Sequence, residues 1–556
     1  MDIKSLIKVI FFVMLLGMLC GCASAGTVYV SPLGTDEYTT DGTDDHIEIN
    51  QALIYASEHP GTTVYLRGPA TYWINSTLTV PNNTIFTGDR TAEVKLINNA
   101  GWARYIGLVE PLNRVGNNIT ICNFTINGNE LNQTVNKGED YYTVLRFDNT
   151  TNLTVHDMVL KNSKNDGVRV HLQTFVEGVG NINVYNNTMD TCCHDSIYLW
   201  KVSGANIYNN DILPNTNSGI RTDGSNHLRI YNNSIHLPTY TGGAGIYILL
   251  GSTIMKANDI EIYNNTVEHT NLAGIYLAGY NQYNLADASS AKIHHNIVKD
   301  CGKHSQGGGY TTYNWGGGIS IQGFNNTTVE NNVVDGCYRN GIYLNDSYIT
   351  TRGSTTVNYK FVTNVKNNII VNTLEHPSFP GSGYGIETLD TNNYSVIMNY
   401  NDFWNNTAGG YDNFTAGAND ISSDPLFVDS AAGNYHLKST EGYWGGTGWL
   451  VALLNSPCID AGDPSSDYSN EPENNGDRVN MGAYGNTVYA SKTAFAPVCD
   501  FSSNTTGGAI NLTVQFTDTS TGHPTSWAWD FNEDAVIDST EQNPTYTYTS
   551  DGTYNV

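Results

Sequence analysis

Short apolar strands separated by asparagine-rich turns recur along most of the chain as a two-part unit. The first part is a strand of the type Ile-x-Val/Tyr-Asn-Asn, and the second is a strand of the type Gly-Ile-Tyr-Leu. The last Asn of the first part recurs every 23 to 36 residues, as Asn187, Asn210, Asn233, Asn265, Asn296, Asn332 and Asn368. Since two or three short strands with minimal turns need about 22 residues, each unit is one coil of a solenoid. The pattern predicts an all-β fold, a right-handed parallel β-helix with loops inserted where the spacing is longer.

Stacked coils bring equal positions of successive units to about 4.8 Å from one another. The recurrent Asn residues are therefore expected to form an internal ladder of side-chain hydrogen bonds with a structural role. Cys301 and Cys337 also occupy equal positions in consecutive coils, within the reach of a disulfide. A bridge and a pair of buried, stacked thiols are both compatible with this spacing.

The second strands predict which side chains face outward, because alternate residues of a strand point to opposite faces. Val168 and Val170 are expected inside. The first outward row contains Arg169, Tyr198, Arg221, Tyr247, Tyr276, Ser320, Tyr343 and Glu387. The second row contains His171, Trp200, Asp223 and Leu249. Tyrosines are ordinary residues of a sheet surface, whereas the charged residues and the Trp gather on three adjacent coils.

The segments outside the repeats are predicted to close or extend the solenoid. Residues 44–59 form an amphipathic helix that would cover the first coil. The apolar residues expected to face the solenoid are Ile47, Ile49, Leu53 and Ile54. Segments 424–429 and 457–464 would close the other end. The expected domains are a signal peptide over 1–25, the β-helix over 26–490 and a small β-sandwich over 491–556.

The first 25 residues have the charged, apolar and small-residue regions of a signal peptide, with cleavage expected after Ala25. Alternatively, Leu19–Cys22 is a lipoprotein box and Cys22 is lipidated. No later segment approaches the roughly 20 apolar residues of a membrane span. We therefore expect a secreted protein, extracellular or associated with the cell surface, that does not span the membrane.

The net charge of −27, from 26 basic and 53 acidic residues, argues against nucleic acid and anionic lipid surfaces as partners. An anionic ligand would need basic side chains to overcome this field at close range. Arg169 and Arg221 would lie about 9.6 Å apart, a separation that could bracket a uronate carboxylate. We expect a monomeric chain whose partner is an acidic polysaccharide.

Hydrolysis of a glycosidic bond normally needs two carboxylates about 5 Å or about 6.5–9.5 Å apart. Asp166 and Asp195 occupy equal positions in consecutive coils, so a close pair with one raised pKa is expected. The alternative is a role in the turn, since Asp or Asn before Gly-Ile is a common turn choice. His194 is the expected proton carrier. Asp223 is a further catalytic candidate, although about 16 Å of strand separates it from Asp195.

Substrate contacts are expected along the two outward rows and in a groove formed by longer turns on both sides of them from residue 245 onward. The expected binding residues are Arg169, His171, Trp200, Arg221, Tyr247, Tyr276, Trp315 and Glu387. A lyase would instead use Arg169, His171 and Arg221 to remove a proton next to a neutralised uronate. The residues fit hydrolysis and elimination equally.

An acidic segment near the C-terminus has the spacing of a calcium-binding loop. Its positions 1, 3, 5, 9 and 12 are Asp530, Asn532, Asp534, Asp538 and Glu541. The sixth position is Ala535, where such a turn requires Gly, and no flanking helix is evident. An acidic hairpin is the main interpretation, and bound Ca²⁺ is the alternative.

The repeats resemble the pectate-lyase-like β-helix superfamily, and the resemblance covers residues 27–490. The opening segments 28–32 and 41–50 look more particularly like the disaggregatases and related surface proteins of methanogenic archaea. Those proteins are implicated in degrading the methanochondroitin matrix that holds cells together. The last 60 residues resemble a PKD domain through Trp527–Phe531, Asn543–Pro544 and Gly552–Val556. Such a domain ends with a further strand, so the sequence indicates a fragment or an incomplete domain.

This resemblance implies an extracellular polysaccharide-degrading enzyme. The expected activity is that of a disaggregatase-like glycoside hydrolase that acts on a uronate-containing matrix polysaccharide such as methanochondroitin and requires no cofactor. A polysaccharide lyase with the same class of substrate is the first alternative. A non-catalytic surface adhesin or glycan-binding protein is the second, and the PKD-like module supports it. β-Helix repeats alone do not define a reaction.

Overall fold

A computed structural model describes most of the chain. The described residues are 26–32, 34–102, 105–133, 142–213, 217–237, 243–251, 255–279, 287–303, 316–345, 361–388, 394–493, 497–522, 524 and 526–556. The expected signal peptide and Trp315 lie outside them, as do the central parts of the loops expected to form the groove. A search of the described helices finds none that is long and apolar enough to cross a membrane.

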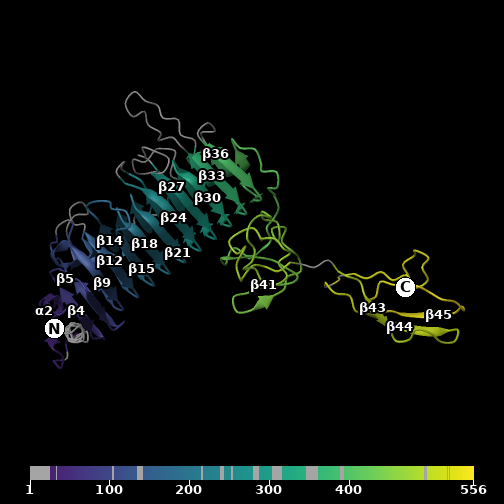
Figure 1. Cartoon of the computed structure of the whole chain (residues 1–556), viewed down its shortest axis with the longest axis horizontal. Helices are drawn as coiled ribbons and strands as arrows, with labels where there is room; N and C mark the ends of the chain where they lie inside the picture. The colour runs from purple at the N-terminus through teal and green to yellow at the C-terminus, as the bar shows by residue number, and fades with distance from the viewer. Residues whose placement is uncertain are drawn as a thin grey trace, which may run out of the picture. The chain divides into compact units, whose positions relative to one another are not determined.

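Three parallel sheets wind around one core, and from residue 63 onward each coil contributes one strand to each sheet, while two earlier strands belong to sheet A alone. Sheet A contains, in spatial order, β2 (Tyr38–Thr39), β1 (Thr27–Ser31), β3 (Thr63–Leu66), β6 (Thr84–Gly88), β9 (Gly116–Cys122), β12 (Thr150–His156), β15 (Gly180–Tyr185), β18 (Ser203–Tyr208), β21 (Asn226–Tyr231), β24 (Ala257–Tyr263), β27 (Ala288–His294), β30 (Asn325–Glu330), β33 (Phe361–Lys366) and β36 (Tyr394–Asn399). From β9 to β36 these strands follow one another along the solenoid from purple to green (Figure 1).

Sheets B and C are built in the same way. Sheet B contains β4 (Ala70–Ile74), β7 (Ala92–Leu96), β10 (Thr125–Asn127), β13 (Val159–Ser163), β16 (Thr188–Cys192), β19 (Asp211–Ile212), β22 (Ser234–His236), β25 (Thr266–Glu268), β28 (Ile297–Lys299), β31 (Val333–Asp335), β34 (Ile369–Val371) and β37 (Asp402–Trp404). Sheet C contains β5 (Leu78–Val80), β8 (Gly107–Pro111), β11 (Thr143–Arg146), β14 (Val168–His171), β17 (Ile197–Trp200), β20 (Ile220–Asp223), β23 (Ile246–Leu249), β26 (Ile275–Ala278), β29 (Ile319–Gln322), β32 (Asn340–Asn345), β35 (Tyr384–Thr388) and β38 (Gly409–Asp412). Two 3-10 turns, η1 (Leu112–Arg114) and η2 (Glu130–Asn132), lie between strands. The predicted parallel β-helix is confirmed.

The Asn-Asn pair of each repeat explains how the coil turns from sheet A to sheet B. The first Asn has a left-handed backbone, with φ between 53° and 55° at Asn186, Asn209, Asn232 and Asn264. Asn tolerates this conformation because its short polar side chain can bond locally. The second Asn then points into the core, where it is buried.

Each of these buried amides bonds to the next coil. Asn233 Nδ2 donates to Asn265 Oδ1 at 2.9 Å and to the Ile207 carbonyl at 3.0 Å, while its Oδ1 accepts from Asn210 Nδ2. The same contact joins Asn187, Asn210, Asn233, Asn265, Asn296, Asn332, Asn368 and Asn401. The ladder then ends on Asp420 Oδ1. The predicted ladder is confirmed and extends one coil further than expected.

One helix, α2 (His46–Glu58), contacts the first strands and covers the first coils. Its buried residues are Ile49, Ala52, Leu53 and Ala56, which recur with the period of a helix. Ile47 and Ile54, expected to face the solenoid, are 48% and 53% exposed. The expected stripe was wrong at these two positions, because the buried face is formed by Ile49, Ala52, Leu53 and Ala56, and Ile47 and Ile54 lie outside it.

The stacked sheets end earlier than the expected boundary at residue 490, because no repeat strand after Asp412 continues sheet C. Residues 425–480 and 484–556 form a second compact unit, while 481–483 belong to the first. Segments 424–429 and 457–464, expected to close the solenoid, therefore fall almost entirely in the second unit. Its sheets are antiparallel: β39 (Phe427–Asp429) with β40 (Asn434–Leu437), β41 (Tyr443–Trp444) with β42 (Trp449–Leu450), and β43 (Phe501–Ser503), β44 (Leu512–Asp518) and β45 (Thr545–Tyr548).

The cysteines of the described residues are all free thiols. Cys301 and Cys337 are buried in consecutive coils, where their sulfurs contact the carbonyls of Val267 and Val298. Of the two predicted arrangements, a disulfide and a pair of stacked thiols, the structure therefore contains the stacked thiols. Burial raises the pKa of Cys337, which keeps this thiol protonated and unreactive.

Substitution of Asn265 by Ala tests the ladder. It removes the acceptor of two Asn233 groups, the backbone N–H and Nδ2, and the donor to the Ile230 carbonyl. Because unsatisfied buried groups each cost about 1–3 kcal/mol, we expect Asn265→Ala to lower the free energy of unfolding by about 3 kcal/mol or more. Urea denaturation followed by circular dichroism measures this change.

Asn206→Ala is the matched control. Asn206 lies on the outer face of sheet A and donates one hydrogen bond, to Asn183 Oδ1 at 3.0 Å. Its loss should lower the free energy of unfolding by less than about 1 kcal/mol. Equal effects of the two substitutions would contradict a structural role that is specific to the buried ladder.

Candidate functional site

The parallel register of sheet C brings the predicted outward residues into two rows. In the first row, Arg169 pairs with Tyr198, Tyr198 with Arg221, and Arg221 with Tyr247. That row continues through Tyr276, Ser320, Tyr343 and Glu387. The second row contains His171, Trp200, Asp223 and Leu249. Both predicted rows are confirmed position by position.

Asp166, His194 and Asp195 form a compact cluster in the turns that lead into β14 and β17. His194 Nδ1 lies 2.8 Å from Asp166 Oδ1 and 3.1 Å from Asp195 Oδ2. Asp166 also accepts hydrogen bonds from Arg169 Nη1 at 3.0 Å and from the backbone N–H of Asp195 at 3.2 Å. Both carboxylates are fully buried, whereas the His194 side chain is 33% exposed. One imidazole therefore joins the two carboxylates and reaches solvent.

Asp195 differs from Asp166 because one of its oxygens accepts no hydrogen bond. Its Oδ1 accepts from Asn217 Nδ2 at 2.9 Å and from the backbone N–H of Ser218 at 3.0 Å. Its Oδ2 is buried and accepts no well-aligned hydrogen bond among the described residues, although His194 Nδ1 lies 3.1 Å away and Arg221 Nη1 3.7 Å away. Asn217 and Ser218 were not predicted. The repeat register could have identified them. They precede the Gly-Ile strand of the next coil, at the positions equivalent to His194 and Asp195.

The guanidinium of Arg221 donates no hydrogen bond within the part of the chain that the structure describes. Its Cζ lies 5.1 Å from the centre of the Tyr198 ring and 5.6 Å from that of Tyr247. Arg169 also lies over Tyr198, at 5.0 Å, but one of its N–H groups is bound to Asp166. Stacking on aromatic rings positions a guanidinium without occupying its donors. Arg221 therefore keeps its donors for a ligand.

The charges of the cluster compensate one another. Burial alone would raise the pKa of Asp166, but His194 and Arg169 outweigh it and lower that pKa. Burial opposes a charged His194, yet the two carboxylates raise its pKa to about 10. Burial raises the pKa of Tyr198 to about 12, despite the two arginines. The expectation that like charge would raise the pKa of one carboxyl is wrong for Asp166, because an imidazolium lies between the two carboxylates.

The second ring nitrogen of His194 faces a donor. Its Nε2 lies 3.2 Å from Asn217 Nδ2, the same nitrogen that donates to Asp195. That contact suits a neutral ring, whereas the carboxylates at Nδ1 favour the imidazolium. The carboxylates determine the protonation state of the ring, because two ion pairs in a buried site outweigh one contact with a neutral amide. The Nε2–H of the charged ring then has no acceptor among the described residues.

The second row separates into an aromatic pair and an isolated carboxylate. The rings of His171 and Trp200 are stacked, with centroids 3.9 Å apart, and burial lowers the pKa of His171 to about 4. Asp223 accepts a hydrogen bond from the Gly251 N–H at 3.1 Å, and burial raises its pKa. The structure does not bring Asp223 into the group formed by Asp166, His194 and Asp195.

The remaining predicted binding residues lie further along the solenoid. Tyr247 and Tyr276 are buried and stack on each other, with ring centroids 5.0 Å apart. Glu387 is buried and accepts a hydrogen bond from Asn340 Nδ2, and burial raises its pKa. These three residues are therefore packed into the sheet surface more than the sequence suggested, which leaves Arg221 and His194 as the accessible polar groups.

The acidic loop of the second unit uses its carboxylates to bind its own backbone. Asp530 accepts hydrogen bonds from the N–H groups of Asn532, Asp534 and Ala535, and Asp538 accepts one from Phe531. Ala535 has a φ of 64°, the left-handed conformation that a calcium loop requires at this position. These bonds fit the acidic hairpin, and calcium at Asp530, Asn532, Asp534, Asp538 and Glu541 stays a prediction.

The Asp166, His194 and Asp195 group places three potential metal-ligand atoms within 4.8 Å of one another. However, His194 and Arg169 already donate to Asp166, and the Arg221 guanidinium lies near Asp195. A metal cation at the same carboxylates would lie next to these positive charges. The arrangement therefore fits acid–base chemistry and anion binding better than metal coordination.

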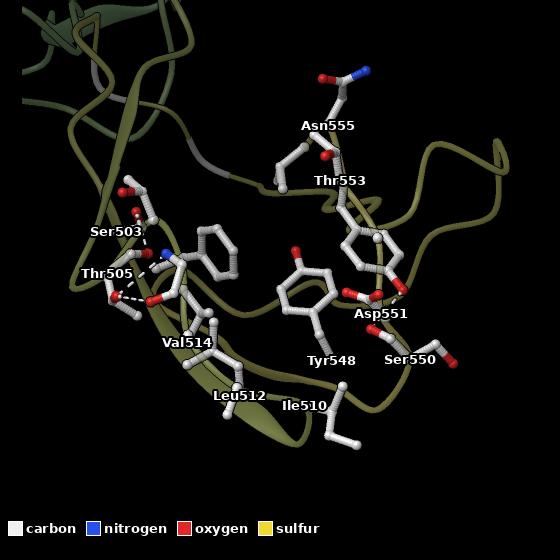
Figure 2. A pocket seen from close by; sticks show the side chains of 18 of the residues that line it. Ser503, Thr505, Ile510, Leu512, Val514, Tyr548, Ser550, Asp551, Thr553 and Asn555 are labelled. Carbon is white, nitrogen blue, oxygen red and sulfur yellow. Dashed lines mark hydrogen bonds between the residues drawn. The ribbon is translucent and has the colours of Figure 1, made fainter.

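A cavity of about 480 Å³ lies in the second unit, beside β44. Figure 2 shows that Leu512, Val514 and Tyr548 line it together with Ser503 and Thr505. Its wall contains apolar residues and hydroxyl groups but, apart from Asp551, no carboxylate, and no histidine. The cavity lacks the groups that acid–base chemistry needs, so it is not the candidate site.

Three family models match successive parts of the chain. Residues 112–282 match the right-handed β-helix region, residues 257–462 match the disaggregatase-related family, and residues 495–556 match the PKD domain. The predicted right-handed β-helix, disaggregatase-related region and C-terminal PKD domain are therefore confirmed. The candidate cluster lies within the β-helix match and before the disaggregatase-related match.

Two solved structures with a similar backbone are distant in sequence. The A-module of mannuronan C-5 epimerase AlgE4 from Azotobacter vinelandii is 14% identical, with a TM-score of 0.40 over 69% of this chain and 94% of that one. A hyperthermoactive exopolygalacturonase from Thermotoga maritima is 12% identical, with a TM-score of 0.40 over 68% of this chain and 87% of that one. No curated protein matches the sequence. At these values the similarity supports no inference about chemistry.

The pKa of His194 predicts a pH-dependent stability. In the unfolded chain a His has a pKa of about 6.5, against about 10 in the cluster. A raised pKa stabilises the fold fully below about pH 6.5, and this contribution is lost as the pH rises through about 10. The difference in unfolding free energy between the wild type and His194→Gln should therefore shrink over this interval.

Urea denaturation of both proteins at a series of pH values measures that difference. Other groups that titrate between pH 6.5 and 10 are common to both proteins, so the difference isolates His194. A difference that stays constant over this interval would mean that the ring is neutral and that the Asn217 contact determines its state.

Proposed function

We propose that this chain is an extracellular enzyme that degrades an acidic, uronate-containing polysaccharide, and that it acts as a glycoside hydrolase. The observation that carries the proposal is the partly exposed group of Arg221, Arg169 and His194 next to the carboxylate of Asp195. This cationic group lies on a chain whose net charge is −27. Such a local reversal of charge selects an anionic ligand.

In the first step, the arginines would hold a uronate carboxylate. Arg221 has no hydrogen-bond acceptor among the described residues, and its planar guanidinium can bind both oxygens of a carboxylate. Arg169 lies two strands away, at a distance of about 9.6 Å, which suits a second contact on the same or the next sugar. The stacked rings of His171 and Trp200 offer a flat surface for a sugar ring beside them.

In the chemical step, His194 and Asp195 would act as acid and base. The Nε2–H of the charged His194 has no acceptor on the described protein, so it can donate its proton to the glycosidic oxygen as the bond to C1 breaks. Asp195 Oδ2 can accept the proton of the water that attacks C1. Asp166 would not act on the sugar, because its oxygens already accept hydrogen bonds from His194, Arg169 and the backbone N–H of Asp195. Its role is to keep His194 charged and oriented.

Elimination is the second candidate reaction, and the position of Tyr198 favours it. The ring of Tyr198 lies between two guanidiniums, which would neutralise the uronate carboxylate and acidify the proton at C5. A tyrosinate could remove that proton while the bond to the C4 oxygen breaks. A pKa of about 12 disfavours the tyrosinate in the free protein, which is why hydrolysis is placed first.

A surface adhesin is the remaining alternative, supported by the PKD domain. PKD and disaggregatase-related domains are typical of surface proteins, which agrees with the proposed extracellular location. An adhesin would bind the same polysaccharide and release no product. Product analysis therefore separates it from both enzymes: new reducing ends alone indicate hydrolysis, and ultraviolet absorbance of an unsaturated uronate indicates elimination.

Asp195→Asn tests the proposed base. Incubation of the chain with an acidic cell-matrix polysaccharide should release oligosaccharides, and the substitution should lower kcat by about 10²–10⁴-fold. Asp190→Asn is the matched control, because Asp190 lies in the preceding strand of the same coil and its carboxylate bonds to Thr191 alone among the described residues. Full activity of Asp195→Asn would exclude this residue as the base, and a wild-type chain that binds but releases nothing would support the adhesin.

Arg221→Gln tests the proposed carboxylate contact. Loss of one charge-assisted contact is worth about 1.5–3 kcal/mol, so KM for the polysaccharide should rise about tenfold or more. The effect should be smaller on a polymer whose carboxylates have been reduced to alcohols. Arg229→Gln is the control, because Arg229 of β21 pairs with Asp259 and Glu261 of β24 on sheet A, away from the rows of sheet C. An equal rise in KM on both polymers would count against recognition of a carboxylate.

A further inference from the structure

Two histidines and a glutamate meet on sheet B, away from the rows of sheet C. His236 ends β22, Glu268 ends β25 in the next coil, and His269 follows Glu268. His236 Nδ1 lies 3.2 Å from Glu268 Oε2, and His269 Nδ1 lies 3.9 Å from the same oxygen. One ligand atom from each residue lies within 4.8 Å of those of the other two. The register produces this arrangement, because it pairs His236 with Glu268.

These distances are close to those that a tetrahedral zinc ion imposes. Zinc binds imidazole nitrogen and carboxylate oxygen at about 2.0–2.2 Å, so neighbouring ligands lie about 3.3–3.5 Å apart. The two distances to Glu268 Oε2 bracket that value, and small rotations of the rings would bring all three atoms onto one ion. Two imidazoles and one carboxylate are also a ligand set that zinc uses when a fourth position stays open.

A second carboxylate lies next to the outer nitrogen of His269. The other nitrogen of His269, Nε2, lies 3.5 Å from Asp300 Oδ2 in the following coil. A metal-bound histidine almost always donates its second N–H to a carboxylate, a carbonyl or water, which orients the ring and raises its basicity. His269 therefore has one nitrogen directed at the cluster and the other at an outer carboxylate, as a metal ligand requires.

The turn that carries His269 explains how this geometry is held. His269 and Asp300 occupy equivalent positions in consecutive coils, both with a left-handed backbone, and Gly336 and Asn372 occupy the same position further on. Gly and Asn are the usual residues for this conformation. The side chains of His236, Glu268, His269 and Asp300 are between 22% and 40% exposed. A solvent ion can reach them, and a water molecule can complete its coordination.

A second histidine cluster on the solenoid provides a contrast. His227 lies 2.6 Å from Glu177 and 2.5 Å from Asp259, but Lys256 and Arg229 bind the same two carboxylates. That cluster is a network of ion pairs with a single imidazole. On sheet B, the strand neighbour of Glu268 in the next coil is the basic residue Lys299. Lys299 in turn has the acidic residue Asp335 as its neighbour in the coil after that.

We propose that His236, Glu268 and His269 bind a divalent transition-metal ion, Zn²⁺, with Asp300 as the outer partner of His269. The site is independent of the proposed glycosidic reaction, because it lies on a different sheet and shares no residue with it. The chain then carries a metal centre with an open position on one sheet and a cationic cluster on another.

Zinc titration of the full chain, prepared without a histidine tag and freed of metal with chelator, tests the proposal by calorimetry. We expect one Zn²⁺ per chain with a Kd in the micromolar range or below. His269→Asn should weaken binding about 100-fold or more, and it should keep the turn, because Asn372 occupies the equivalent position in another coil. Asp300→Asn should weaken binding about 10–100-fold, as outer partners do.

His227→Gln and His194→Gln are the matched controls, and both should bind zinc as the wild type does. X-ray absorption at the zinc edge should report two imidazole ligands in the wild type and one in His269→Asn. The absence of stoichiometric binding would overturn the proposal. So would a Kd unchanged by His269→Asn, or a loss of affinity in His227→Gln as large as that in His269→Asn, because zinc would then bind elsewhere.

Discussion

The buried ladder of asparagine amides is the interaction on which the rest of this structure depends. A single coil has too few residues to bury its own apolar side chains, so each coil is stable only when it is stacked in register with its neighbours. The contact from Asn233 to Asn265 at 2.9 Å, repeated along the core, selects that register, because a slip of one residue would bury an amide without a partner. The apolar side chains stabilise the stack and also oppose such a slip, because it would turn them to the outer face.

The same register creates the charged cluster. Asp166 and Asp195 come from equivalent turns of consecutive coils, so stacking places two carboxylates side by side in a buried position. Two such charges would oppose folding if they were alone. His194 and the two arginines compensate them, which raises the pKa of His194 to about 10 and leaves a positive surface at the exposed side. The requirement for charge balance thus produces the anion-binding character that the proposed function uses.

The sequence predicted everything that follows from the period of the repeat. The ladder from Asn187 to Asn368 and the row from Arg169 to Glu387 were both correct, because strand alternation and coil stacking leave no freedom in these positions. Features that depend on side-chain torsion angles could not be predicted. Two examples are the orientation of the His194 ring between two carboxylates and the burial of the Tyr276 side chain in the sheet surface. The period of the repeat also does not determine where the stacked sheets end, and the last strand of sheet C is β38.

The unequal partners of Asp166 and Asp195 argue for function over pure structural compensation. If the cluster served only to neutralise buried charge, both carboxylates should be saturated, since each unsatisfied buried oxygen costs about 1–3 kcal/mol. Asp166 is saturated by His194, Arg169 and a backbone N–H. Asp195 Oδ2 accepts no well-aligned hydrogen bond among the described residues, although His194 Nδ1 lies 3.1 Å away, and the guanidinium beside it donates none there either. A carboxylate oxygen and a guanidinium that lie 3.7 Å apart without a hydrogen bond are the arrangement expected where a ligand or a reacting water enters between them.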